Sequence, residues 1–280
     1  MSVEPDKALI HAELEKAGLS SVVVHTFDTL PSTSVWLRDL ASKADEPLNV
    51  PHLCSTDWQS AGVGRRGRSW QTKPGNITFS ILSTTQKPPK ELLGLSLVTG
   101  LGVASCLAAE LDVQAALKWP NDVLLNDLKL GGLLTEVTSV SGTDQAKHHG
   151  RSAAANTQIV TGIGINLRHD DEVVDLGIGA TSLESVSVPN GPQQRDILIG
   201  KLAASVLTSH QEFFERGWAP FAEAWKARDW LYGKQVTIHQ DKTTEHALAC
   251  GVNEQGALLV ERAGETHLLY SGNVSIRPTV

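Results

Sequence analysis

Cysteine is scarce in this sequence. Its 280 residues include only three, Cys54, Cys106 and Cys250. An odd number at wide spacing, without a C-x-x-C pair, argues against a disulfide framework and against a zinc site. We expect each to be a small core residue, and the pattern favours a reducing compartment, the cytoplasm.

Long apolar runs and targeting signals are also absent. The longest candidate, residues 92–111, is interrupted by Gly, Ser, Thr and Glu, so no stretch reaches the roughly 20 apolar residues of a membrane-spanning helix. Residues 1–7 have neither the basic flank nor the apolar core of a secretion signal. We therefore expect a cytoplasmic protein with no membrane partner.

There is no overall excess of positive charge. Lys and Arg number 24 against 31 Asp and Glu, a formal net charge of −7, so bulk electrostatics do not favour a nucleic-acid binder. A local cluster of basic residues would then suit a small anion. The length allows one large domain, or one large and one small domain.

Such a cluster occurs between Gly62 and Trp70, where the sequence is GVGRRGRSW. Its three glycines let backbone N–H groups approach a ligand, because no Cβ stands in the way. Arg65, Arg66 and Arg68 supply planar, permanently charged side chains that suit carboxylate and phosphate groups. The run predicts a loop that holds an anion. Taken alone, it also fits a solvated surface loop.

The same run formally matches the dinucleotide fingerprint G-x-G-x-x-G. That fingerprint requires a helix at its third glycine and an acidic residue about 20 positions later. Residues 68–76 do not favour a helix, and residues 81–83 contain no carboxylate. A Rossmann site is therefore disfavoured, and a Walker loop is excluded because no G-K-[ST] follows.

Periodicity and turn residues predict a mixed α/β chain. We expect helices at residues 7–18, 35–43 (capped by Ser34), about 91–110, 194–216 and 218–229. We expect strands at residues 21–27, 48–58, 76–82, 123–125, 129–137 and 158–167, with a mobile loop at 138–156. Short strands at 234–239, 247–252, 257–261 and 265–270 predict a small C-terminal β-barrel.

Two short segments carry further signals. Hydroxyls at Ser32, Thr33 and Ser34 lie at a helix start, where they suit either a neutral polar ligand or simple capping. Gly131 and Gly132 lie inside a predicted strand, which marks close approach of a ligand or another backbone. Lys129 precedes them and, without these glycines, would be taken for a surface lysine.

Four motifs in order now resemble one family, the biotin protein ligases. They are residues 59–70 (QSAGVGRRGRSW), 118–122 (KWPND), 129–134 (KLGGLL) and 162–166 (GIGIN). The resemblance covers the chain from about Phe27 onward. It implies an α+β fold, a class II aminoacyl-tRNA synthetase-like mixed β-sheet with helices (residues 1–231), followed by an SH3-like β-barrel (residues 232–280). Only about 25 residues precede the catalytic part, so we expect a ligase without the DNA-binding repressor domain and without DNA as a partner.

The resemblance also implies the reaction. Biotin and ATP form biotinyl-5'-AMP with Mg²⁺ as cofactor, and biotin then passes to a lysine of the biotin carboxyl carrier domain of a carboxylase. Positive side chains would neutralise charge as it moves between the two anions. The chemistry needs no protein nucleophile.

Matching positions carry the family's roles onto this sequence. The resemblance implies catalytic roles for Lys129, Arg65 and Arg68, and a metal-binding or loop-orienting role for Asp122. It implies biotin contacts from Ser32, Thr33, Ser34, Gln59, Val63, Gly64, Arg65, Lys129 and Gly132. It implies ATP contacts from Arg65, Arg68, Trp70, Lys118, Asn121, Lys129, Asn166 and Arg277.

Three positions depart from the family pattern. Val63 stands where arginine is usual, Ser34 where many members have asparagine, and Ala180 where some place a tryptophan over the adenine. A lipoate ligase, or a non-catalytic regulator that binds biotin or a nucleotide, remains an alternative. The sequence leaves the oligomeric state open between a monomer and a weak homodimer.

Overall fold

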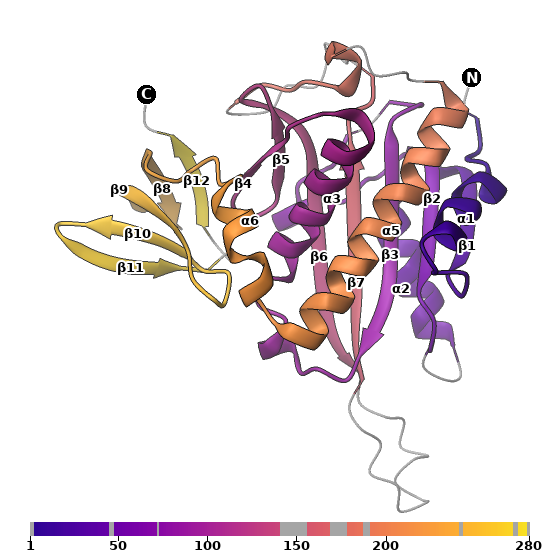
Figure 1. Ribbon diagram of the computed structural model, residues 1–280, viewed down its shortest axis with the longest axis horizontal. Helices are drawn as coiled ribbons and strands as arrows, with labels where there is room; N and C mark the ends of the chain where they lie inside the picture. The colour runs from indigo at the N-terminus through magenta and orange to yellow at the C-terminus, as the bar shows by residue number, and fades with distance from the viewer. Residues whose placement is uncertain are drawn as a thin grey trace, which may run out of the picture.

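The computed structural model describes residues 3–44, 48–71, 73–140, 156–168, 178–186, 191–240, 243–270 and 274–278, and two β-sheets organise them (Figure 1). The larger sheet has the strand order β1-β2-β3-β7-β6-β5-β4. Only β1 and β2 pair in parallel; the remaining neighbours are antiparallel. Its strands are β1 (Val23–Leu30), β2 (His52–Gln59), β3 (Ile77–Thr85), β4 (Ala116–Lys118), β5 (Asp122–Leu125), β6 (Leu128–Val140) and β7 (Asn156–Ile165).

Helices cover the two faces of this sheet unequally. On one face, α1 (Lys7–Lys16), α3 (Leu95–Leu111) and α5 (Pro192–Arg216) pack together and onto the strands; Figure 1 shows α3 and α5 side by side in front of the sheet. On the other face, α2 (Thr33–Lys43) contacts β2, β3 and β7. The short helix α6 (Ala222–Lys226) follows α5.

Strand alternation explains the two cores, because successive side chains point to opposite faces. Leu53 and Ile81 join the main core under α1, α3 and α5. Their sequence neighbours Cys54 and Leu82 join a smaller core under α2. The apolar residues of α3 are buried around most of the helix, as its composition predicts.

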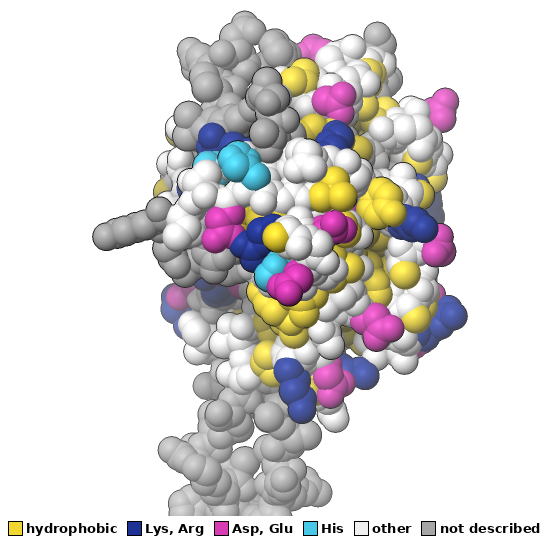
Figure 2. All heavy atoms as spheres, turned by 90° about the vertical axis from the view of Figure 1, so that its left-hand side faces the viewer, with side chains coloured by type: hydrophobic (Ala, Val, Ile, Leu, Met, Phe, Trp, Pro, Cys, Tyr) yellow, Lys and Arg dark blue, Asp and Glu magenta, His cyan; other side chains and the backbone are white. Residues whose placement is uncertain are grey.

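The second sheet is C-terminal and wholly antiparallel. It consists of β8 (Gln235–Gln240), β9 (Thr243–Val252), β10 (Leu258–Arg262), β11 (Glu265–Leu269) and β12 (Val274–Pro278), in the order β11-β10-β9-β8-β12. Trp119, buried beside β4, donates its indole N–H to Gly256 O at 3.0 Å. This bond ties the second sheet to the first. Figure 2 shows this end of the molecule, where acidic, basic and apolar side chains are interspersed.

The predicted fold class is confirmed, and the observed elements differ from the predicted ones at several places, including the unpredicted strand β4. The N-cap of α2 is Ser32 rather than Ser34, because the helix begins two residues earlier than expected. The strand β6 continues to Val140, although residues 138–140 were expected in a loop; residues 141–155 of that loop lie outside the described residues. The helix expected at 218–229 is a short 3₁₀ turn followed by α6. The strand β12 was not predicted; the boundary between residues 231 and 232 stays a prediction.

Among the described residues, no helix combines the length and apolarity needed to cross a bilayer.

A buried histidine predicts how stability depends on pH. His210 on α5 contacts Thr99 Oγ1 through Nε2 at 2.8 Å, and its Nδ1 is buried without a hydrogen-bond partner among the described residues. Burial lowers the pKa of His210 to about 4. In the unfolded chain the same imidazole is protonated below about pH 6.5, whereas in the folded protein it stays neutral down to about pH 4. Protonation therefore favours the unfolded state, and the free energy of unfolding falls between about pH 6.5 and 4.

The free energy of unfolding should be lower at pH 5 than at pH 7, and we expect His210→Gln to make this difference smaller by about 2 kcal/mol. Urea unfolding at the two pH values measures it. His246→Gln, at an exposed position on β9, is the matched control. An unchanged difference in the His210 variant would contradict the assignment.

Candidate functional site

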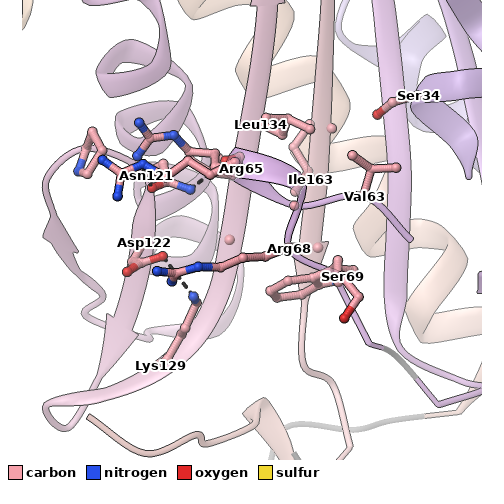
Figure 3. Close-up of a pocket in the computed structure, with 18 of the residues that line it drawn as sticks. Ser34, Val63, Arg65, Arg68, Ser69, Asn121, Asp122, Lys129, Leu134 and Ile163 are labelled. Carbon is pink, nitrogen blue, oxygen red and sulfur yellow. Dashed lines mark hydrogen bonds and ion pairs between the residues drawn. The ribbon is translucent and has the colours of Figure 1, made fainter. Parts of the chain in front are cut away.

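The face of the large sheet that α2 covers only in part contains a cavity of about 190 Å³. Its walls come from the start of α2, the glycine-rich run, strands β3, β6 and β7, the β4–β5 turn and β12. Figure 3 shows Ser34 at one end of this cavity and Asp122 with Lys129 at the other. The two ends differ in chemistry.

The end near α2 is a chain of buried hydroxyls. Thr33 donates its hydroxyl to Gln59 Oε1 at 3.1 Å, and its backbone N–H donates to the same oxygen at 2.8 Å. Ser80 Oγ lies 2.7 Å from Thr33 Oγ1 and 2.8 Å from Ser34 Oγ. Each hydroxyl has one hydrogen, so Ser80 donates to Thr33 and Ser34 donates to Ser80. All three hydroxyl hydrogens are therefore used within the chain, and only the oxygen lone pairs remain to accept hydrogen bonds from a ligand. This end of the cavity suits a neutral ligand with N–H donors.

Three glycines form the floor beneath the glycine-rich run. A Cβ on Gly164 would lie 2.5 Å from the indole of Trp70, and one on Gly132 would lie 3.0 Å from it. A Cβ on Gly162 would lie 2.8 Å from Ser34 Oγ. The bare backbone of β6 and β7 thus makes room for the Trp70 ring and for the hydroxyl end.

The Trp70 ring is held by this fit and by a cation–π contact, since Lys129 Nζ lies over the ring at 5.9 Å from its centroid. Its Nε1–H is buried and has no hydrogen-bond partner within the described chain. Leaving a buried donor unpaired costs about 1–3 kcal/mol. The position of the indole therefore depends on the small residues under it.

The glycine-rich run folds back on itself over the cavity. Gly64 donates its N–H to Arg68 O at 2.8 Å, and Trp70 donates its N–H to Gly62 O at 2.8 Å. Arg66 has φ +59°, a left-handed conformation that is uncommon outside glycine. This turn directs Arg65 and Arg68 into the same cavity.

Positive charge dominates the far end. Among the described residues that line the cavity, Asp122 carries the one acidic side chain. The basic ones are Arg65, Arg66, Arg68, Lys118, Lys129 and Arg277. Lys129 Nζ lies 3.0 Å from Asp122 Oδ1, and Lys118 Nζ lies 3.7 Å from Oδ2 (Figure 3). Basic side chains thus outnumber acidic ones among the described residues of this end, which suits an anionic ligand.

An irregularity in the pairing of strands β5 and β6 sets the position of Lys129. The register between β5 and β6 shifts so that Val123 pairs with Gly131 but Leu124 pairs with Lys129, which leaves Leu130 as a bulge. A bulge re-aims the neighbouring side chains. The backbone of Lys129 is also fixed from outside the hairpin, because its N–H donates to Gly179 O at 3.0 Å and its O accepts from Thr181 N at 2.9 Å.

Arg65 is held within the crowded positive end. Its Nη1 donates to Asn121 Oδ1 at 3.1 Å, and Asn121 Nδ2 donates to Leu133 O at 2.8 Å. Burial, and then the charges of Arg66 and Arg68, lower the pKa of Arg65 from its usual value, while Asp122 opposes the change. The guanidinium remains charged, and an added anion would relieve the repulsion that lowers its pKa.

The structure brings together the predicted site residues with one exception. The exception is Asn166, which does not line the cavity. Its backbone N–H donates to Leu130 O at 2.9 Å, at the bulge, and its Nδ2 donates to Thr181 O at 3.0 Å. Asn166 therefore lies behind Lys129, and its contact with ATP stays a prediction.

Several lining residues were not among the predicted biotin, ATP or metal contacts, although Arg66 belongs to the run that was expected to hold an anion. Besides Arg66 they are Ser69, Thr78, Phe79, Ser80, Trp119, Pro120, Leu133, Leu134, Gly162, Ile163, Gly164, Ile178 and Ile276. The most informative is Ser80, which links two predicted residues through its hydroxyl. Its place between Phe79 and Ile81, in a strand that alternates polar and apolar residues, was the available signal.

The described residues that line this cavity do not form a dedicated magnesium site. The described residues contain no group of three or more His, Cys, Asp or Glu side chains that could hold a metal ion. The carboxylate oxygens of Asp122 already face Lys129 and Lys118, and Asn121 Oδ1 accepts from Arg65. Such a donor set, already engaged by cations, does not by itself fit Mg²⁺.

Known proteins resemble this chain in sequence and in fold. The sequence model of the biotin/lipoate A/B protein ligase family matches residues 27–151. "Bifunctional ligase/repressor BirA" of Salmonella typhimurium is 29% identical over 276 residues, which are 97% of this chain and 78% of that protein. "Biotin--[acetyl-CoA-carboxylase] ligase" of Paracoccus denitrificans is 29% identical over 234 residues, 80% of this chain and 91% of that protein.

Among solved structures, the biotin protein ligase from Aquifex aeolicus, in complex with biotin and ATP, superposes with a TM-score of 0.71. It is 24% identical, and the match covers 92% of this chain and 99% of that one. The similarity confirms the fold expected from the four motifs.

The fit of Trp70 over the glycine floor is testable. In Gly164→Ala, the added methyl would lie within 2.5 Å of the indole; such a contact forces one of the two groups to move. We expect the ring and the glycine-rich run to shift outward, so that trypsin cleaves after Arg65, Arg66 or Arg68 several-fold faster.

A double-mutant cycle supplies the control. In the Trp70→Ala background, Gly164→Ala is expected to have no further effect on the cleavage rate. An equal effect of Gly164→Ala in both backgrounds would rule out the contact as the cause.

Proposed function

We propose that this chain, which belongs to the biotin protein ligases, activates biotin with ATP and transfers it to a carrier domain. The observation that supports the proposal is the shape of the cavity. A neutral, hydroxyl-lined end and a cationic end are joined in one space, with Lys129 at the cationic end.

The two ends suit the two parts of biotin. Its ureido ring is neutral and carries N–H donors, which the oxygens of Ser34, Thr33 and Ser80 would accept. Its carboxylate would then reach toward the cationic end, where the triphosphate of ATP also finds its counter-charges. Lipoate has a dithiolane ring without N–H donors, so this hydroxyl end favours biotin over lipoate.

In the proposed first step, a carboxylate oxygen of biotin attacks the α-phosphorus of ATP. The new P–O bond gives biotinyl-5'-AMP, and pyrophosphate leaves with the bonding electron pair. Two anions repel each other, so Lys129, Arg65 and Arg68 would lower the barrier by neutralising charge at the reacting centre. In the second step, an acceptor lysine attacks the carbonyl carbon and AMP leaves.

The remaining parts of the proposal rest on the sequence resemblance. The acceptor is the biotin carboxyl carrier domain of a biotin-dependent carboxylase. Magnesium would accompany ATP, held mainly by the phosphate oxygens, with Asp122 either near it or orienting its loop. The chain would act in the cytoplasm as a monomer or a weak homodimer.

Biotin-dependent exchange of pyrophosphate into ATP tests the first step. We expect Lys129→Ala to reduce the exchange rate by about 100-fold or more, the effect of removing one preorganised charge-stabilising donor. The thermal unfolding midpoint should change little, because Lys118 still faces Asp122.

Lys201→Ala is the matched control. Lys201 pairs with Glu110 on α3, outside the cavity, so exchange should be unchanged in this variant. Near-normal exchange in Lys129→Ala would remove Lys129 from the reaction. If the unmodified chain shows no exchange, the result would favour the alternative of a non-catalytic regulator that binds biotin or a nucleotide.

Substitution of Thr33 tests which ligand the hydroxyl end holds. Thr33→Val keeps the shape but breaks the hydroxyl chain, leaving Ser80 without its acceptor. We expect the dissociation constant for biotin to rise about 10-fold or more, with binding of ATP alone unchanged, both measured by calorimetry.

Thr26→Val is a control of the same chemistry, because the Thr26 hydroxyl lies on β1 outside the cavity and donates to Glu4 Oε1 at 2.8 Å. Tighter binding of lipoate than of biotin by the unmodified chain would favour the lipoate ligase alternative.

A further inference from the structure

A buried ionic cluster lies outside the cavity and joins three segments of the chain. Arg195, Asp57 and Asp196 are each 2% exposed. Arg195 pairs with Asp57 through Nη1, with Asp196 Oδ1 through Nε at 2.8 Å, and with Val3 O through Nη2 at 3.1 Å. Arg195 lies in the first turn of α5, and Figure 1 shows the N-terminus beside this end of the helix.

Asp57 connects the cluster to the glycine-rich run. Its Oδ1 accepts the backbone N–H of Gly75 at 2.9 Å, and its Oδ2 accepts that of Val3 at 3.2 Å. Asp57 lies in β2, before the run of residues 62–70, and Gly75 lies after it, just before β3. One carboxylate therefore joins the two ends of the segment that carries Arg65, Arg68 and Trp70.

Energetics make this junction rigid. A buried carboxylate separated from its cation would lose several kcal/mol, so Asp57 cannot swing away from Arg195. Arg195 is itself fixed by the helix and by Asp196. Joining the ends of a loop removes much of its conformational freedom, so the cluster restricts where the intervening run can lie.

Gly75 is adapted to this position. Its φ is +89°, which disfavours a side chain, and a Cβ there would lie 3.0 Å from Arg168 Nε. The next residue, Asn76, accepts the backbone N–H groups of Leu167 and Arg168 through Oδ1, at 2.8 and 2.9 Å. The far end of the run is thereby also tied to the residues that follow β7.

We propose that Asp57, held by Arg195, is a positioning residue that keeps the glycine-rich run seated over the cavity. The inference rests on the proposed function, since the run would shield the adenylate until the acceptor arrives. Asp57 does not line the cavity; it acts through the backbone of Gly75.

Asp196 provides a matched comparison. It is equally buried, contacts the same guanidinium, and accepts one backbone N–H, that of Asp6 at 2.8 Å. Asp6 is remote in sequence from the glycine-rich run. A purely structural role of the cluster predicts equal effects of changing Asp57 and Asp196, whereas a positioning role predicts a difference.

The experiment compares Asp57→Asn with Asp196→Asn in the full chain. We expect trypsin to cleave ligand-free Asp57→Asn after Arg65, Arg66 or Arg68 about 10-fold faster than the unmodified protein, the effect of losing one charge-assisted hydrogen bond. Biotinyl-adenylate should leave this variant faster by a similar factor. The KM values should rise more than kcat falls. Asp196→Asn should match the unmodified protein in cleavage and release, even if its unfolding midpoint falls.

Equal changes in the two variants, or normal cleavage in Asp57→Asn, would overturn the proposal. Where Asp57→Asn does not fold, Arg195→Lys replaces it, because lysine keeps the charge but not the fork that reaches Asp57 and Val3 together; the same increases are expected. Cleavage is measured without ligand. The cleavage rate therefore tests the positioning role of Asp57 even if the unmodified chain forms no adenylate. Failure to form adenylate would instead contradict the proposed function.

Discussion

Electrostatic repulsion between two anions is the constraint on which the rest of this structure depends. A carboxylate and a triphosphate approach each other only where positive charge is already in place, because reorganising water or side chains during the reaction would raise the barrier. The chain as a whole is acidic, with a formal net charge of −7, yet six basic side chains and one acidic side chain line the described cavity. The fold concentrates cations that the composition alone would disperse.

Backbone irregularities achieve this concentration. Glycines in β6 and β7 leave a floor on which the Trp70 ring rests, and the bulge at Leu130 re-aims Lys129. The left-handed residue Arg66 turns the glycine-rich run back over the sheet. Each of these features departs from regular strand geometry. The main core, to which α3 and α5 contribute, supplies the stability that offsets these departures.

Local patterns predicted much of this arrangement, and contacts distant in sequence account for the rest. The glycine-rich run, the Lys129 strand and most helices follow from residue spacing, since each signal lies within about ten residues. Ser80 was missed because its importance comes from hydroxyls 46 and 47 residues away. Asn166 was expected among the ATP contacts, but the structure places it behind the bulge, a position that depends on pairing between β6 and β7. The role of Arg195 was equally invisible, because its partners Asp57 and Val3 lie 138 and 192 residues away.

The contribution of β12 to the cavity has a consequence for the newly made protein. Ile276 and Arg277 line the same space as Arg65, although translation reaches them 211 and 212 residues later. A nascent chain with its entire first sheet folded still lacks two of the side chains that line the cavity. The cavity is therefore complete only after the ribosome has added β12 and the second sheet has docked against the first.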